Sequence, residues 1–128
     1  MQKYLAAIDW KVLLFASVGC YVLPALFFGT LVSLAMGDGA SEHGQWLAPM
    51  SLAAWLLLAP LAAGYLAARF ARQLPQAHVA LVGLIGAALC LVKLSAAPAV
   101  LCAFAVAVLS ASAVGGFICL RSKAKREA

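Results

Sequence analysis

Long apolar runs separated by short polar segments dominate the chain. The runs cover residues 12–36, 46–70, 78–94 and 99–120. An α-helix needs about 20 residues to cross a hydrocarbon core of roughly 30 Å, and each run is close to this length or longer. The pattern predicts an all-α, polytopic membrane protein. We expect residues 1–128 to form a single transmembrane domain, with four transmembrane helices in an antiparallel bundle.

Prolines and glycines mark where these helices should bend or end. Pro24 lies near the middle of the first run and Pro60 lies deep in the second. Proline removes one backbone hydrogen bond from a helix, so we expect a kink at each position. Ser17 and Tyr21 are candidates to satisfy the groups freed near Pro24. Residues 37–45 contain three glycines and predict a polar loop.

The basic residues are distributed unequally between the two sides of the predicted membrane. Only Lys93 falls on one side. The other eight are Lys3, Lys11, Arg69, Arg72, Arg121, Lys123, Lys125 and Arg126. Basic segments stay in the cytoplasm, so the bias predicts that both termini are cytoplasmic. The short loops and this bias also favour a bacterial inner membrane. Residues 121–128 are predicted to form a mobile basic tail.

The composition supports a lipid environment. Hydrophobic residues make up 66% of the chain and charged residues 10%, whereas a soluble domain is about 25% charged. A soluble fold of this size could not bury so much apolar surface. The net charge of +5 does not predict nucleic-acid binding, because no aromatic residues alternate with the basic ones to stack on bases. We expect membrane lipids as partners and no nucleic acid.

Small residues at helical spacing predict where the helices pack. In lipid, close packing at small residues holds helices together. The candidates are Gly64, Ala68, Gly83, Gly86, Ala103, Ala107, Ala111 and Gly115. Aromatic and cationic residues at the ends of the runs predict anchors at the membrane interface or on lipid phosphate. These anchors are Trp10, Trp46, Arg69, Arg72 and Lys93.

Two of the four cysteines flank the turn between the third and fourth runs. Cys90 and Cys102 should lie at similar depth, so a disulfide could form if they face each other; two unpaired packing residues are the alternative. No CxxC pair is present and no histidine lies at zinc-ligand spacing. Asp38, Glu42 and His43 belong to a glycine-rich loop with too few ligands for a metal. We therefore predict neither a metal nor a cofactor.

One segment resembles a known kind of hairpin. It comprises Gly64, Tyr65, Leu66, Ala67, Ala68 and Arg69, followed by Pro75, His78 and Gly83. Residues 64–86 are similar to a hairpin that recurs in small, uncharacterised four-helix bacterial membrane proteins. The resemblance implies a fold and no activity.

The chain offers no group for catalysis or for proton-coupled transport. Small multidrug exporters rely on a glutamate embedded in their first helix, and the first run here has no acid. Serine, histidine and acidic residues are scattered over different depths, so no catalytic triad is predicted. The leading hypothesis is a non-enzymatic accessory or partner-binding subunit, immunity-type binding included. Its partner would be another membrane protein or a second copy. The alternative is an oligomeric transporter, channel or holin-like pore former.

Overall fold

The computed structural model describes residues 6–37, 42–93 and 97–128, and every regular element within them is helical. The elements are α2 (Trp10–Ser17), the π-helical turn η1 (Val18–Val22), α3 (Leu23–Gly37), α4 (Glu42–Phe70), α5 (Pro75–Lys93) and α6 (Pro98–Glu127). Four stretches are long and apolar enough to cross a membrane: Trp10–Leu31, Pro49–Phe70, Pro75–Val92 and Pro98–Glu127. The all-helical class is confirmed for the described residues, as is the presence of four helices long and apolar enough to span a membrane.

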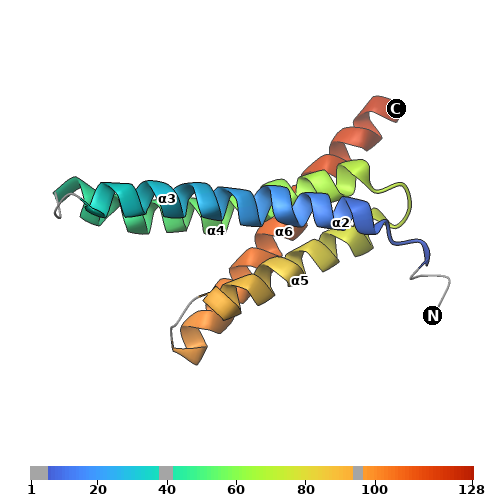
Figure 1. Ribbon diagram of the computed structural model, residues 1–128. Helices are drawn as coiled ribbons and strands as arrows, with labels where there is room; N and C mark the ends of the chain where they lie inside the picture. The colour runs from blue at the N-terminus through green and yellow to red at the C-terminus, as the bar shows by residue number, and fades with distance from the viewer. Residues whose placement is uncertain (1–5, 38–41, 94–96) are drawn as a thin grey trace.

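The helices form two hairpins that meet at one end. The continuous helix from α2 to α3 lies beside α4, and α5 lies beside α6 (Figure 1). Near the meeting point α4 packs against both α5 and α6. Toward the opposite end the two hairpins diverge, and α3 makes its main contacts with α4 and η1. We call α3 and the facing residues 42–54 of α4 the outer arm.

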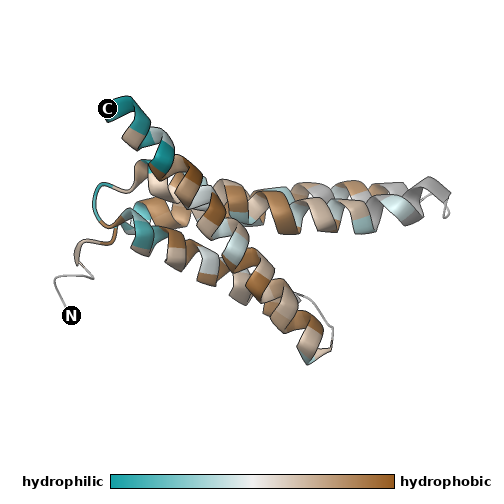
Figure 2. Cartoon of the chain, turned by 180° about the vertical axis from the view of Figure 1, so that it is seen from behind, coloured by the Kyte–Doolittle hydropathy of each residue, from teal (hydrophilic) through white to brown (hydrophobic). Residues whose placement is uncertain are grey.

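Hydrophilic residues gather at the end where the hairpins meet. Residues 6–9, the connection from α4 to α5 and the C-terminal end of α6 lie at this end (Figure 1), and Figure 2 shows hydrophilic colouring on the connection and on the end of α6. We call this region the basic end. Its described basic residues are Lys11, Arg69, Arg72, Arg121, Lys123, Lys125 and Arg126.

Two helices begin earlier than the sequence predicts. α5 starts at Pro75 instead of residue 78, because proline is well suited to the first turn of a helix, where its missing N–H is not needed. α4 starts at Glu42 instead of residue 46. The predicted loop over residues 37–45 is therefore shorter than expected, since Gly37 still belongs to α3. Residues 38–41 lie outside the described part of the chain.

The fourth helix does not end at residue 120 as the sequence predicts. α6 continues as one helix to Glu127. Lys123 Nζ donates hydrogen bonds to the carbonyl oxygens of Ala68 at 3.0 Å and Arg69 at 3.1 Å. These carbonyls belong to the last turn of α4, where a cation also complements the negative end of the helix dipole. The contact ties the end of α6 to the end of α4.

The first span contains a wide turn directly before Pro24. In η1 the N–H of Leu23 donates to the carbonyl of Val18, five residues back. Such a π-helical turn accommodates a break in the usual hydrogen-bond ladder, and proline causes that break because it has no N–H. Ser17, one predicted source of compensation, has a buried hydroxyl oxygen with no hydrogen-bond partner. Within the turn the carbonyl of Tyr21 accepts a hydrogen bond from Trp55 Nε1 of α4 at 3.1 Å.

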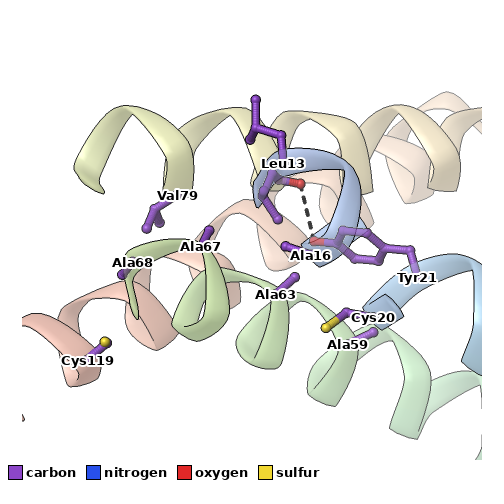
Figure 3. Packing of buried hydrophobic residues seen from close by; sticks show 11 residues of the cluster. Leu13, Ala16, Cys20, Tyr21, Ala59, Ala63, Ala67, Ala68, Val79 and Cys119 are labelled. Carbon is purple, nitrogen blue, oxygen red and sulfur yellow. Dashed lines mark hydrogen bonds between the residues drawn. The ribbon is translucent and has the colours of Figure 1, made fainter. Parts of the chain in front are cut away.

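Small residues line the main core, to which all four spans contribute (Figure 3). Its buried members are Leu13, Ala16, Cys20, Tyr21, Ala59, Ala63, Ala67, Ala68, Val79, Val82 and Cys119. Ala59, Ala63 and Ala67 recur every four residues and so share one face of α4. Short side chains allow neighbouring helix backbones to approach closely, which is the main source of helix association in lipid.

Candidate functional site

The crossing of α4 and α6 brings two backbones into contact. A Cβ atom at Gly64 would lie less than 3.0 Å from the carbonyl oxygen of Ser112, and one at Gly115 less than 3.0 Å from the carbonyl oxygen of Leu61. Real Cβ atoms do not approach other atoms so closely. Only glycine fits these two positions, so the crossing depends on this pair of residues.

The contact between α5 and α6 uses glycine and one hydroxyl group. A Cβ at Gly116 would lie 2.6 Å from a methyl carbon of Val79. A Cβ at Gly83 would lie 3.2 Å from the Leu109 side chain and 3.3 Å from that of Ser112. Ser112 Oγ donates to the carbonyl of Val79 at 3.1 Å. Ser112 therefore contacts α4 through its backbone and α5 through its side chain.

Tyr21 joins the first span to the other hairpin. The residue is buried, and its hydroxyl donates to the carbonyl of Val82 at 3.3 Å, shown dashed in Figure 3. A Cβ at Gly86 would lie 2.5 Å from the Tyr21 ring, so glycine makes room for it. The ring also packs edge-on against Trp55, with centroids 6.4 Å apart. The aromatic pair thus fixes η1 against both α4 and α5.

A buried histidine holds the N-terminal segment to α5. His78 is fully buried, and its Nε2 accepts a hydrogen bond from the Asp9 N–H at 2.9 Å. Its Nδ1 lies 3.0 Å from the carbonyl oxygen of Leu74, to which it donates. The neutral tautomer protonated on Nδ1 satisfies both bonds. Asp9 in turn caps α2, because its Oδ1 accepts from the Lys11 N–H at 3.2 Å.

The predicted packing residues divide between buried and exposed positions. Those buried are Gly64, Ala68, Gly83, Gly86 and Gly115. Ala111 is half-buried, whereas Ala103 and Ala107 are exposed. The face of α6 that is buried carries instead Val108, Ser112, Gly115, Gly116 and Cys119. A row spaced by four residues drifts around a helix with 3.6 residues per turn, whereas positions 108, 112, 115 and 119 alternate steps of four and three and stay on one face.

The cysteines and the predicted interface anchors differ in burial. All four cysteines are free; Cys90 is buried beside Leu56 and Val108, and Cys102 is exposed. The exposed predicted anchors are Trp10, Trp46, Arg69 and Arg72. Lys93 is the last residue of α5, and its side chain lies outside the described part of the structure.

No catalytic or metal-binding arrangement emerges from the described residues. Within residues 6–37, 42–93 and 97–128 no group of three or more His, Cys, Asp or Glu residues could hold a metal ion. The loop considered for a metal falls outside this range at Asp38, as do the side chains of Glu42 and His43. Comparisons with protein-family models, with curated proteins and with solved structures give no match.

The small residues of α3 are exposed. Among the described side chains of α3 none is buried. Ala25, Gly29 and Ser33 recur every four residues and are all exposed, and a Cβ at Gly29 would have nothing within 4 Å. The hydroxyl of Thr30 bonds to its own helix, at the Leu26 carbonyl, at 2.7 Å. We call Ala25, Gly29 and Ser33 the α3 small-residue face.

Proposed function

We propose that this chain is a non-enzymatic membrane subunit that binds a transmembrane helix of another membrane protein through the α3 small-residue face. The observation that carries the proposal is that α3 has no buried side chain among its described residues. Apolar exposure alone would not suggest a partner, because lipid solvates apolar side chains well. Small residues at i, i+4 spacing do suggest one, since they permit close helix contact.

The other glycines of the spans show how this chain uses such positions. Those with a neighbour within contact distance are Gly64, Gly83, Gly86, Gly115 and Gly116. Each accommodates an adjacent helix or a ring packed against its own helix. Gly19 of η1 and Gly29 of α3 differ from these five, because a Cβ at either position would have nothing within 4 Å; only Gly29 belongs to a row of small residues at i, i+4 spacing. A partner helix crossing α3 at Gly29 would give this residue the role that its counterparts have within the chain.

The location of the protein is part of the same proposal. The basic end carries seven of the nine Lys and Arg residues of the chain within its described part. By the positive-inside rule this end faces the cytoplasm of a bacterial inner membrane, and the outer arm points to the opposite side. A reporter enzyme fused after Lys125 that is active only outside the cytoplasm would contradict this orientation.

The alternative, an oligomeric transporter or pore, places second copies of the chain on α3. The hydroxyl of Thr30, one of the polar groups that could line such a path, already bonds to its own backbone. Native mass separates the two cases, because a pore former gives a homo-oligomer and a subunit gives a complex with a different protein.

The test compares three tagged forms extracted in mild detergent from the native membrane: wild type, Gly29→Leu and Ala107→Leu. Both substitutions enlarge an exposed small residue, but only Gly29 belongs to the α3 small-residue face. Overpacking an interface costs about 1–3 kcal/mol, which lowers recovery of the partner roughly 5-fold to 150-fold. We expect a single stoichiometric partner with wild type and Ala107→Leu and its loss with Gly29→Leu. Equal recovery of the partner with all three forms would refute the proposal.

A further inference from the structure

A surface groove at the basic end combines cationic and aromatic residues. It lies between the start of α2 and the end of α4. The groove is lined by Asp9, Lys11, Val12, Phe15, Phe70 and Arg72. These residues come from two segments about 60 positions apart in the sequence, so the fold creates the groove.

The lining residues include an aromatic pair and two cations. Phe15 and Phe70 make an edge-to-face pair with ring centroids 6.2 Å apart, and both remain more than half exposed. Lys11 lies four residues before Phe15 on the same face of α2. Arg72 follows Phe70, the last residue of α4, by two positions. Lys11 and Arg72 therefore lie closer to the ends of the helices than the aromatic floor, as we call the Phe15–Phe70 pair.

The rim of the groove favours an anion. Lys11 and Arg72 are exposed, and they face a single carboxylate, that of Asp9. The Asp9 carboxylate already accepts the Lys11 N–H as the cap of α2. A neighbouring concavity toward the N-terminal segment shares Asp9, Lys11 and Arg72 and adds Trp10. The two cations thus border both hollows and can be reached by one headgroup.

We propose that this groove binds one phospholipid with a net negative headgroup. The phosphate lies between Lys11 and Arg72, and an acyl chain packs against Phe15 and Phe70. The polar and apolar layers of the groove match the two halves of such a lipid. The site is separate from the α3 small-residue face, so the lipid proposal stands or falls independently of the partner proposal.

Anionic lipid is attracted to any exposed basic residue, so the site needs a control that measures this general attraction. Lys125 and Arg126 are also exposed, and they lie at the end of α6. Neither belongs to the lining of the groove. Removing these two charges lowers the net charge by the same amount as removing Lys11 and Arg72, so the pair provides a matched control.

The experiment is native mass spectrometry of the full chain in detergent, titrated with phosphatidylglycerol or phosphatidylcholine. We expect one phosphatidylglycerol to be retained by the wild type in preference to phosphatidylcholine. Lys11→Gln with Arg72→Gln should lower its affinity roughly 10- to 30-fold, since each basic residue near a membrane surface contributes about a factor of five. Lys125→Gln with Arg126→Gln should leave it unchanged.

Two further variants separate the two layers of the site. Asp9→Asn keeps a capping side chain but removes the only acid of the groove, so it should strengthen phosphatidylglycerol retention. Phe15→Ala with Phe70→Ala should weaken retention while leaving the charges in place. Unchanged unfolding midpoints establish that the variants are folded.

Specific outcomes would overturn the lipid site. An equal loss of phosphatidylglycerol in the control pair would reduce the effect to general charge attraction. Equal retention of phosphatidylglycerol and phosphatidylcholine would remove the anionic preference. Displacement of the lipid by inorganic phosphate at millimolar concentration would show that the headgroup binds without the aromatic floor, contrary to the proposal.

Discussion

The crossing of α4 and α6 and the outer arm use the same residue types with opposite results. At the crossing, Gly64 and Gly115 bring two backbones into contact. On the outer arm, Gly29 faces open space although Ala25 and Ser33 extend the same pattern. The hydroxyls differ in the same way. Ser112 donates to the Val79 carbonyl on another helix, whereas Thr30 donates to the Leu26 carbonyl of its own helix.

A row of small residues therefore indicates only that another helix can pack closely there. Whether the contact is intramolecular depends on where the rest of the chain places a second helix. Lys123 ties the end of α6 to the last carbonyls of α4, and Ser112 ties α6 to α5, so further contacts hold the crossing in place. α3 makes its main contacts with α4 and η1, and its small residues remain free to receive a helix from outside the chain.

The largest expected effect comes from Gly64→Val compared with Gly29→Val. The new side chain at position 64 would overlap the carbonyl of Ser112. We expect a loss of more than about 3 kcal/mol in the free energy of unfolding, because backbone atoms cannot move aside as side chains do. At position 29 the change should stay within about 0.5 kcal/mol, as for an exposed site. Unfolding titration with SDS in mixed micelles measures both.

Similar destabilisation by the two substitutions would contradict the contrast between the crossing and the outer arm, because it would mean that Gly29 is also in intramolecular contact. A matched pair of Gly→Ala variants at the same positions provides the control for size, since even one methyl group is excluded at Gly64 and tolerated at Gly29.

A smaller effect is expected from His78→Ala. The substitution leaves the Asp9 N–H without its partner, whereas the Leu74 carbonyl still accepts from the N–H groups of residues 77 and 78. An unsatisfied buried polar group costs about 1–3 kcal/mol, and we expect a loss of about 2 kcal/mol in the free energy of unfolding. Hydrogen exchange of the Asp9 amide should accelerate at the same time. Unchanged protection of that amide would show that His78 does not hold the N-terminal segment.

The smallest effect is expected from Lys123→Gln. A cation on the last carbonyls of a helix contributes about 0.3–1 kcal/mol, and Lys123 bonds to two such carbonyls at the end of α4. The same change at the exposed Lys125 is the control and should have no measurable effect on stability. If both variants unfold alike, the end of α6 is not tied to α4.

The sequence was sufficient to predict the number of spans and the residues at several contacts. Hydrophobic run length alone defines the four membrane-crossing helices, because the hydrocarbon core imposes a minimum length. Gly64, Gly83, Gly86 and Gly115 were predicted as packing residues, and all lie at close contacts. These predictions depend on local spacing, which a single chain displays directly.

Other features depend on which helices become neighbours and were not predictable. Ala103 and Ala107 were expected to pack but are exposed, because alanine is frequent enough to form rows on any face. In the sequence His78 is only the first residue of a predicted helix, and its hydrogen bond with the Asp9 N–H depends on the fold. The helical end of α6 is stabilised by carbonyls of α4, and Lys11 and Arg72 come to line one groove only after folding.

Site-specific photocrosslinking in native membranes is the sharpest test of the proposal that α3 docks a partner helix. A photoreactive amino acid would replace Ala25 in one form and Ala107 in another, since both are exposed. If α3 docks a partner helix, we expect one discrete protein adduct from position 25 and none from position 107. Adducts to lipid alone at position 25, or the same protein adduct at both positions, would contradict it.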